Sequence, residues 1–229
     1  MSETKKLKVI IGVERKLSPD ELDFFSSRFE VEQVEFESIL KKRPGKRIDF
    51  LYFSGGADVN PALYGQKKGK STFIDEKRDE MCQAIYNSYP GTPKLGICRG
   101  SQFLTVMAGG KLIQHVEGHT SSHKIDVHFE GNSRPSTFDI TSTHHQMMYP
   151  FNMNADKYAL IGWSTMHRSM VYLDGDDNQM SLPEKFVEPE IIYYRLHRSL
   201  AIQGHPEYNN CSKDTKDLCL DLIETYLLN

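Results

Sequence analysis

The sequence predicts an α/β fold with a mostly parallel central sheet, helices on both faces and an additional antiparallel portion in the second half. Apolar, β-rich runs alternate with helical segments through the first half, which favours a parallel sheet with right-handed crossover connections. In the second half, successive runs read as strands separated by turns, which favours antiparallel pairing. A chain of 229 residues commonly folds around one core. We therefore expect a single domain over residues 1–229.

The first elements are marked by an apolar run and by a helix-capping signal. Residues 6–13, KLKVIIGV, predict a buried strand. Ser18 then stands at an N-cap position, with Pro19 at the first helical position and acids in the first turn. Residues 31–36 and 47–56 predict a second and a third strand, and the third stops at a pair of glycines.

A longer helix, a fourth strand and another helix follow. Residues 72–89 carry Phe73, Met81 and Ile85 at helical spacing before the break PGTP. The run KLGIC at 94–98 predicts a short strand, and the segment after it predicts a helix that ends at two glycines. Because ligands bind at the carboxyl ends of parallel strands, we expect the glycine-marked ends of the third and fourth strands to face one site.

The second half is expected to be richer in strands. Its predicted antiparallel strands, the last two joined by a polar turn, span residues 123–128, 136–143, 158–166, 190–196 and 199–205. Residues 174–185, DGDDNQMSLPEK, predict an exposed loop. An amphipathic helix over residues 213–227 closes the chain.

Charge and composition exclude several classes of function. The formal net charge is −3, and 38% of the residues are hydrophobic and 26% charged, which is typical of a globular chain without a positive field for a polyanion. No apolar stretch approaches the roughly 20 residues of a membrane span, and the N-terminal apolar run is too short for a signal peptide. We therefore expect a cytoplasmic protein, with neither nucleic acid nor membrane as a partner.

The four cysteines form no pattern of metal ligands or disulfides. Cys82, Cys98, Cys211 and Cys219 share no CxxC spacing and pair with no close set of histidines. Neither a metal site nor a disulfide framework is expected from them. Cys82 lies in a predicted helix, where a free cysteine usually acts as a small core residue.

Cys98 lies between two glycines at a strand-to-helix turn, in LGICRGSQ (95–102). This is the pattern of a nucleophile elbow, in which flanking glycines relieve crowding around a strained backbone. A thiol at a helix N-terminus also meets the positive end of the helix dipole and free N–H groups, which favour the thiolate. A packed core thiol at an ordinary turn is the alternative when the motif is taken alone.

The segment QGHPEY supplies a base and an acid that could orient it. Residues two apart in extended chain project to the same side, so Glu207 can reach one ring nitrogen of His205 and leave the other for Cys98. An acyl-transfer site also needs donors for the oxyanion. The N–H of Arg99 is one, and the SGG turn at 54–56 is positioned to supply a second.

With these motifs the chain resembles the class I glutamine amidotransferases, whose Cys-His-Glu triad lies on a flavodoxin-like, three-layer α/β fold. Within that superfamily it most resembles the gamma-glutamyl-gamma-aminobutyrate hydrolase family of C26 peptidases. The stretches that carry the resemblance are SGGADVNPALYG (54–65), DEKRDEMCQAI (75–85), LGICRGSQFLTVMAGGKLIQH (95–115), TSTHHQ (141–146) and IQGHPEY (202–208).

Carried over by position, the resemblance implies Cys98 as nucleophile, His205 as general base and then acid, and Glu207 as its orienter. It implies that the backbone amides of Gly56 and Arg99 form the oxyanion hole. The side chains implied to hold the glutamyl part of a substrate are those of Gln102, Ser142, His144 and His145. For the two histidines, a polar loop without substrate contact is the alternative.

The implied activity is hydrolysis of a gamma-glutamyl amide through a glutamyl thioester, without a metal or organic cofactor. Its partner would be a small molecule, a gamma-glutamyl amide or glutamine. If the chain is instead a glutaminase subunit, ammonia leaves and a separate synthetase is a partner. A non-catalytic binding relative is a third alternative, against which the intact Cys98, His205 and Glu207 argue. A homodimer is compatible with each of these alternatives.

Two departures from the family pattern stand out. Gly204 occupies the position before HPE where the family usually has a tryptophan, so we expect a packing wall near His205 to be missing. Residues 174–185 are longer than a plain hairpin needs, and a partner-docking or lid element is the alternative to a solvated loop there.

Overall fold

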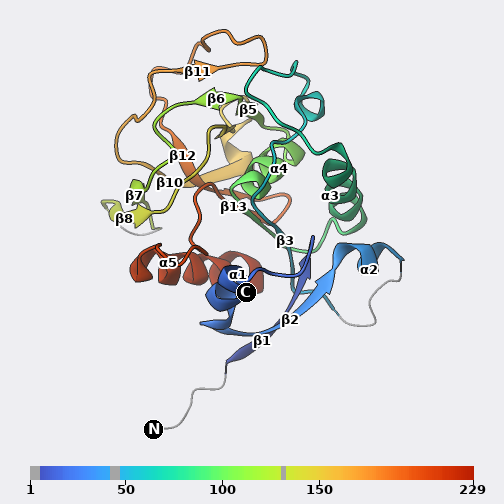
Figure 1. The fold of residues 1–229 in the computed structure, drawn as a ribbon. Coiled ribbons are helices and arrows are strands. Elements are labelled where there is room, and N and C mark those ends of the chain that lie inside the picture. Colours follow the sequence, from blue (N-terminus) through green and yellow to red (C-terminus); the bar gives the residue numbers. More distant parts are fainter. Residues whose placement is uncertain (1–5, 42–46, 130–132) are drawn as a thin grey trace.

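The computed structural model describes residues 6–41, 47–129 and 133–229 and is organised around a long mixed sheet (Figure 1). In these residues the sheet has nine strands, in the order β2-β1-β3-β4-β13-β12-β10-β7-β8. In that order the strands are Phe29–Glu35, Leu7–Val13, Phe50–Phe53, Lys94–Ile97, Ser199–Ile202, Pro189–Tyr194, Tyr158–Ser164, His123–Val127 and Ser136–Ile140. Two small sheets pair β5 with β9 and β6 with β11; their strands are Lys111–Ile113, Met147–Tyr149, His115–Val116 and Tyr172–Leu173.

One half of the long sheet is parallel and has the strand order of a flavodoxin-like fold. β1 pairs in parallel with β2 and β3, and β4 pairs in parallel with β3 and β13. Numbered along the chain, these strands follow the order 2-1-3-4-5. Phe53 lies opposite Gly96, and Ile97 lies opposite Ile202, so β3, β4 and β13 end at the same edge. The predicted parallel sheet is confirmed.

The other half of the sheet is antiparallel, as the second half of the sequence predicts. β13 pairs with β12, β12 with β10, β10 with β7, and β7 with β8, all in antiparallel register. β13 therefore joins the two halves, because one of its edges pairs in parallel with β4 and the other antiparallel with β12. The α/β fold class with a mixed sheet is confirmed.

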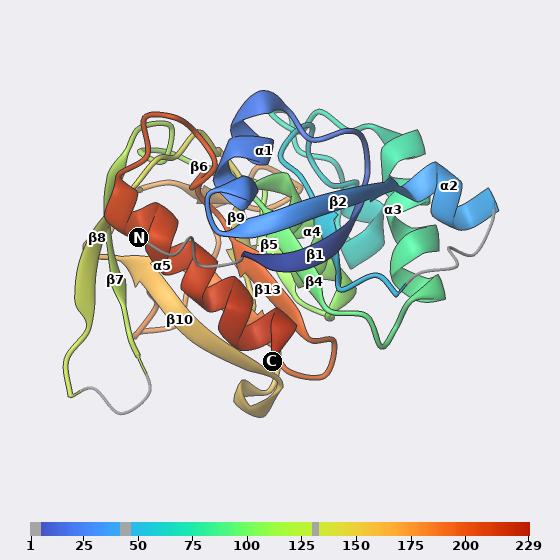
Figure 2. The same cartoon turned by 90° about the horizontal axis from the view of Figure 1, so that it is seen from below.

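Helices cover both faces of the sheet, which gives three layers (Figure 2). The side chains of β3 alternate between the faces: Phe50 and Tyr52 pack with α1 and α5, and Leu51 and Phe53 pack with α2, α3 and α4. The helices α1 to α5 are Pro19–Ser26, Phe36–Lys41, Glu76–Ser88, Arg99–Met107 and Lys213–Ile223, and the shorter helical segments η1 to η3 are Pro61–Tyr64, Ala155–Lys157 and Glu224–Leu228.

Two local expectations need correction. Phe73 does not belong to the helix predicted over 72–89; α3 begins after Asp75, whose carboxylate accepts a hydrogen bond from the N–H of Arg78, and Phe73 is 71% exposed. Phe36, expected at the end of a strand, instead begins α2. Burial explains this start, because the ring of Phe36 packs 5.3 Å from that of Phe53 on the face covered by α2, α3 and α4.

The N-terminus of α1 is closed by a capping box. Ser18 Oγ accepts a hydrogen bond from the N–H of Glu21, and the Glu21 carboxylate accepts one from the N–H of Ser18. We expect Ser18→Ala to lower the free energy of unfolding by about 1 kcal/mol in urea titrations, because one helix N–H loses its partner. Asn154→Ala is the control, since Asn154 makes no side-chain capping bond; equal losses for both variants would contradict the prediction.

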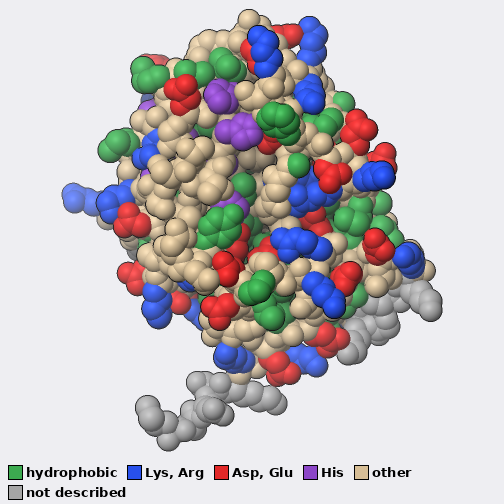
Figure 3. Space-filling view, viewed as in Figure 1, with side chains coloured by type: hydrophobic (Ala, Val, Ile, Leu, Met, Phe, Trp, Pro, Cys, Tyr) green, Lys and Arg blue, Asp and Glu red, His purple; other side chains and the backbone are tan. Residues whose placement is uncertain are grey.

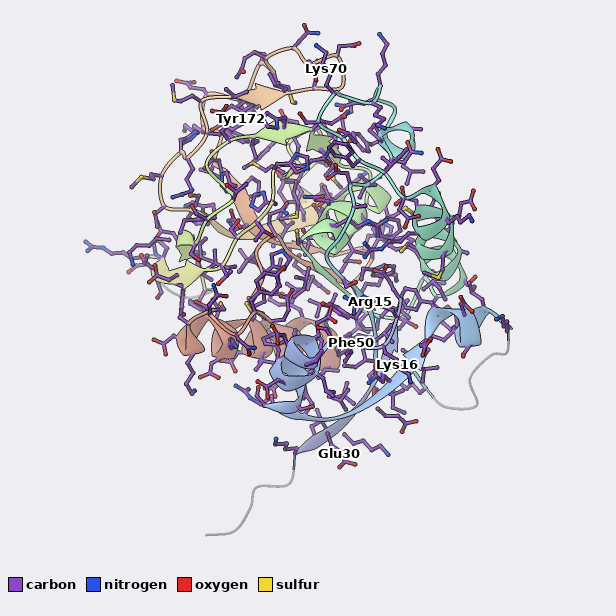
Figure 4. All side chains as sticks on the ribbon, in the orientation of Figure 1. Arg15, Lys16, Glu30, Phe50, Lys70 and Tyr172 are labelled. Atoms are coloured by element: carbon purple, nitrogen blue, oxygen red, sulfur yellow. The ribbon has the colours of Figure 1, made fainter. Side chains whose placement is uncertain are left out.

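Residues 174–185 are mostly exposed and are tied to residues 67–70. Lys67 Nζ lies 2.7 Å from Asp176 Oδ1, and a Cβ atom on Gly175 would lie 2.1 Å from the Lys67 carbonyl oxygen. Figure 4 labels Lys70, in the second of these segments, and Tyr172, two residues before the first, both at the top of the molecule. The segment is therefore anchored at its start by backbone contact as well as by surface ion pairs.

The helices of the described regions are short. The longest, α3, has 13 residues, whereas a membrane-spanning helix needs roughly 20 apolar ones. Within residues 6–41, 47–129 and 133–229, no helix has the length and hydropathy to cross a bilayer.

Candidate active site

A cavity of about 500 Å³ lies at the carboxyl ends of the parallel strands. Each of four neighbouring strands is followed by a residue that lines it: Arg15 after β1, Gly56 after β3, Cys98 after β4 and His205 after β13. This is the edge at which ligands bind in doubly wound sheets. Figure 3 shows histidine and charged side chains gathered on this face, and Figure 4 labels Arg15 near the end of β1.

Cys98 occupies the turn between β4 and α4 with a strained backbone. Its φ of +50° and ψ of −110° lie outside the backbone regions that residues other than glycine normally adopt. The flanking glycines permit this turn: a Cβ on Gly100 would lie 1.9 Å from the carbonyl oxygen of Phe53, and one on Gly96 would lie 2.4 Å from that of Gly100. The turn therefore holds the Cys98 side chain at the cavity.

His205 and Glu207 lie beside Cys98, as the spacing of HPE predicts. His205 Nδ1 is 2.7 Å from Glu207 Oε1, and the ring also interacts with the Cys98 thiol. Tyr208 stacks on the imidazole, with 4.2 Å between ring centroids. Burial disfavours the imidazolium, but the hydrogen bonds with Cys98 and Glu207 outweigh it and raise the pKa of His205 to about 10. These partners therefore favour the imidazolium form of His205.

The SGG turn is held by two charged residues that the sequence did not indicate. Arg78, on α3, donates to the carbonyl oxygen of Ser54 at 2.8 Å and forms an ion pair with Glu14. Glu14 in turn accepts the Ser54 N–H. Gly56 has a φ of +147°, and a Cβ there would lie 2.1 Å from Arg78 Nη1. The positive φ therefore favours glycine at 56, and a side chain there would also displace the Arg78 guanidinium.

The side chain of Arg99 turns away from the cavity. It is 1% exposed, forms a buried ion pair with Asp79, and contacts Cys82 Sγ at 3.4 Å. Only the backbone of Arg99, at the N-terminus of α4, is left for the cavity side. The side chain instead fastens α4 to α3 through Asp79 and Cys82.

The four side chains implied to hold a substrate lie in different surroundings. Gln102 and His145 line the cavity; Gln102 Nε2 donates to the Gln146 carbonyl oxygen, and His145 Nε2 is 3.2 Å from Asp58 Oδ1. His144 also borders the cavity, but its Nε2 faces Glu190 at 3.6 Å. Ser142 is not among the described residues that line the cavity, and its hydroxyl donates to the His119 carbonyl oxygen.

Several charged and aromatic residues line the cavity although no sequence motif indicates that they belong to the site. Arg15 and Glu21 form an ion pair of 2.8 Å at one side, Asp58 pairs with His145 at another, and the exposed Phe73 lies at the cavity. Asp58 could have been suspected, because it follows the SGG turn by two residues. For Arg15 and Phe73 no local signal exists, since only the fold brings them here.

No additional space opens at Gly204. A Cβ at this position would lie 2.6 Å from Ile140 side-chain atoms and 2.8 Å from the Thr141 carbonyl oxygen. The same carbonyl accepts the N–H of His205 at 2.7 Å. The expectation of a missing wall is therefore wrong in this chain, because β8 and the backbone after it fill the place that a tryptophan would take.

Comparison with known proteins identifies the family. The profile of the peptidase C26 family matches residues 37–158. The protein of Lactococcus lactis named "Putative glutamine amidotransferase-like protein YvdE" is 32% identical over 198 residues, which cover 78% of this chain and 73% of the relative. The chain belongs to the peptidase C26 family. A further relative, a Mycobacterium tuberculosis protein named "Putative glutamine amidotransferase Rv2859c", is 33% identical over 176 residues, which cover 69% of this chain and 50% of that protein.

Solved structures agree with the C26 assignment at the level of the fold. A "putative gmp synthase subunit a protein" from Thermoplasma acidophilum superposes with a TM-score of 0.58 at 16% identity, covering 96% of this chain and 98% of that one. A glutamine amidotransferase from Thermotoga maritima gives a TM-score of 0.54 at 11% identity, covering 98% and 85%. At these identities the likeness concerns the fold alone.

Proposed function

We propose that this C26 protein is a cysteine-dependent hydrolase that cleaves a gamma-glutamyl amide. The observation that carries the proposal is the strained Cys98 in the cavity with the His205–Glu207 pair beside it. A nucleophile, a base within reach and a third group that orients the base are the parts that acyl transfer by a thiol requires. The reaction as proposed uses neither metal nor organic cofactor.

In the first step, the Cys98 thiolate attacks the side-chain carbonyl carbon of the glutamyl group. The N–H groups of Gly56 and Arg99 stabilise the resulting oxyanion. His205, held by Glu207, donates its proton to the leaving amine, and the C–N bond breaks to leave a glutamyl thioester. In the second step His205 accepts a proton from water, the hydroxide attacks the thioester, and glutamate leaves as the Cys98 sulfur is released.

The charges around the cavity suit the amino-acid end of a glutamyl group. Arg15 can receive the α-carboxylate, while Asp58 and Glu21 offer negative charge to the α-ammonium group. The pKa of His145 is raised by its hydrogen bond to Asp58, although burial opposes the charged form. Phe73, 71% exposed at the cavity, offers an apolar surface to the part of the substrate that leaves.

The test is release of glutamate from a panel of gamma-glutamyl amines, with glutamine included and Cys98→Ala as the blank. Turnover of one or more gamma-glutamyl amines, well above that of glutamine, supports the proposal. Glutamate release by neither substrate class, with a correctly folded protein, contradicts it and favours a non-catalytic binding protein.

A glutaminase subunit that delivers ammonia to a separate synthetase is the second candidate. The names of the relatives, which call them putative glutamine amidotransferases, favour it. In that case glutamine alone is hydrolysed, and the rate increases when a synthetase partner is present. The same panel separates the two candidates, because only the hydrolase accepts gamma-glutamyl amines with bulky leaving groups.

Gly56→Ala is expected to lower kcat/KM by about a hundredfold to a thousandfold, which is the scale for losing one oxyanion donor. The added Cβ meets Arg78 and the φ of +147° disfavours alanine, so the Gly56 amide shifts from its place. Gly91→Ala is the matched control, since nothing lies within 4 Å of its Cβ position. Similar activity of both variants in the glutamate-release assay would argue against the oxyanion role.

On the basic limb of the pH profile, kcat/KM is expected to fall only at a pH well above the ordinary imidazole pKa of about 6.5. The raised pKa means that His205 retains its proton until high pH, and the proton is lost as pH rises through that value. Glu207→Gln removes a negative charge that favours the imidazolium, so the limb moves to lower pH. Asp23→Asn, at an exposed acid on α1, should leave the limb in place; an unmoved limb in Glu207→Gln would refute the assignment.

A further inference from the structure

A second group of titratable side chains lies buried next to the cavity, outside the proposed catalytic residues. We call it the His–Glu cluster; its members are His119, His123, His144, Glu188 and Glu190. They come from the loop before β7, the start of β7, the loop before β9, and the segment leading into and along β12. Each residue is at most 5% exposed. The chemistry proposed for Cys98 uses none of these groups.

One carboxylate oxygen is the centre of the cluster. Glu190 Oε1 lies 3.3 Å from His119 Nδ1, 3.0 Å from His123 Nε2 and 3.6 Å from His144 Nε2. Ligand atoms bound tetrahedrally at about 2.0–2.1 Å from a zinc ion are separated by roughly 3.4 Å. One ligand atom from each of His119, His123 and Glu190 lies within 4.8 Å of the others. The nitrogen-to-oxygen distances of 3.0–3.6 Å are therefore close to the separations between ligand atoms of one zinc ion.

The remaining ring nitrogens are held by acceptors that set the tautomers. His123 Nδ1 is 3.1 Å from the Ser121 carbonyl oxygen, and His144 Nδ1 is 2.8 Å from that of Gln146. A carbonyl oxygen only accepts, so both Nδ1 atoms carry the hydrogen, and a neutral ring directs the Nε2 lone pair at Glu190. Two lone pairs facing a carboxylate repel unless a cation lies between them or the rings are doubly protonated. Such outer acceptors are typical of metal-binding histidines.

For His119, the group beside the second ring nitrogen is the carboxylate of Glu188 rather than a carbonyl oxygen. Its Oε2 lies 3.1 Å from His119 Nε2, and its carboxylate also accepts the Tyr172 hydroxyl and the N–H groups of Arg168 and Ser169. The Glu188 carboxylate thus lies on the Nε2 side of the His119 ring, and Glu190 lies on the Nδ1 side. A carboxylate that holds the far nitrogen of a metal-binding imidazole is a recurrent arrangement.

The charge balance and the unsatisfied polar atoms of the cluster also favour a bound cation. Two carboxylates are buried here, and their ion-pair partners among the described residues are histidines rather than lysine or arginine. Buried carboxylates are costly without compensation, and one divalent ion neutralises two of them. In the described parts of the chain, both ring nitrogens of His119, His144 Nε2 and Glu190 Oε2 are buried without a hydrogen bond of good geometry.

We propose that the His–Glu cluster binds a structural divalent transition-metal ion, with zinc as the best match. Zinc takes nitrogen and carboxylate ligands, and His144 as a fourth ligand beside His119, His123 and Glu190 would close a tetrahedral shell and leave no position for a substrate. The ion would join β7 and β12 to the loop that carries His144, His145 and Gln146, which line the cavity. It would therefore stabilise one side of the cavity without taking part in the chemistry.

The test is metal binding by the full chain after treatment with a chelator and dialysis. Titration with Co²⁺ should give one equivalent per chain and the intense visible absorption of tetrahedral cobalt, and Zn²⁺ should displace it and raise the melting temperature. Glu190→Gln and His123→Gln should lose the spectrum and the rise in melting temperature. His128→Gln, at an exposed histidine directly after the same strand, should keep both.

A purely protonic cluster, with an imidazolium between two carboxylates, is the competing explanation. It predicts the same melting temperature with chelator and with Zn²⁺ and no cobalt spectrum, and either result overturns the proposal. Equal binding by His123→Gln and His128→Gln also overturns it. If the cluster variants do not fold, zinc-edge X-ray absorption of the native chain decides: imidazole and carboxylate ligands support the site, and a sulfur or all-oxygen shell refutes it.

Discussion

Replacing Cys98 by alanine is expected to reduce turnover of a gamma-glutamyl amide at least about a thousandfold, because no other group can form the thioester. Stability should change little, since the substitution removes only the sulfur atom of a small buried side chain and alanine meets the same backbone strain. Cys98→Gly should be equally inactive but more stable than Cys98→Ala, because glycine adopts the φ of +50° at lower cost. Glutamate release and urea unfolding measure the two effects.

Thiol labelling provides an independent test of the same assignment. Burial raises the pKa of Cys82 to about 12 and raises those of Cys211 and Cys219 as well, so these three thiols are poor nucleophiles. A glutamine-like diazo-ketone should therefore label Cys98 first. Cys211→Ser should keep both labelling and turnover. Retained hydrolysis in Cys98→Ala, or labelling that survives it at an equal rate, would disprove the nucleophile.

Asp79→Asn is expected to lower the free energy of unfolding by about 3–5 kcal/mol, which is the scale for breaking a buried ion pair. The substitution leaves the Arg99 guanidinium, 1% exposed, without a counter-charge. Burial also raises the pKa of Asp79, with Arg99 opposing the shift, so the carboxylate depends on its partner. Urea unfolding followed by circular dichroism measures the loss.

Two further variants show whether charge burial is the cause. Asp139→Asn removes an acid from an ion pair with Lys124 whose two side chains are 62% exposed, and it should change the stability little. The double variant Asp79→Leu/Arg99→Met removes both buried charges and should recover part of the loss. If Asp79→Asn and the double variant are equally stable, the loss in Asp79→Asn is not caused by an unpaired buried charge. The Arg99 backbone amide remains in every variant, so effects on turnover and on stability can be separated.

The elbow and the HPE motif illustrate what local sequence can predict. GICRG indicates a strained strand-to-helix turn because glycines two residues on either side of a cysteine leave room where the backbone crosses β3. His205 and Glu207 face the same way because they are two apart in extended chain. Both conclusions depend on spacings of a few residues, which the fold does not alter.

The surroundings of the site could not be predicted in this way. Arg78 reaches the SGG turn from α3, which the sequence does not indicate. The elbow motif assigns a role to the backbone amide of Arg99 and gives no indication that its side chain forms a buried ion pair with Asp79. The sequence is compatible with His144 as a substrate contact or as a loop residue, whereas in the structure His144 Nε2 lies 3.6 Å from Glu190, 46 positions further along the chain. These contacts join segments that only the crossovers of the sheet bring together.

The sequence by itself determined the alternation of strands and helices, the mixed sheet and the glycine-flanked cysteine, because periodicity and short spacing encode them locally. Only the tertiary structure decided which polar side chains are buried and with which partners. It fills the place beside Gly204 with Ile140 and Thr141, and it gathers His119, His123 and Glu190 around one point. Burial determines the cost of a charge and the value of a partner, and burial is a property of the assembled chain.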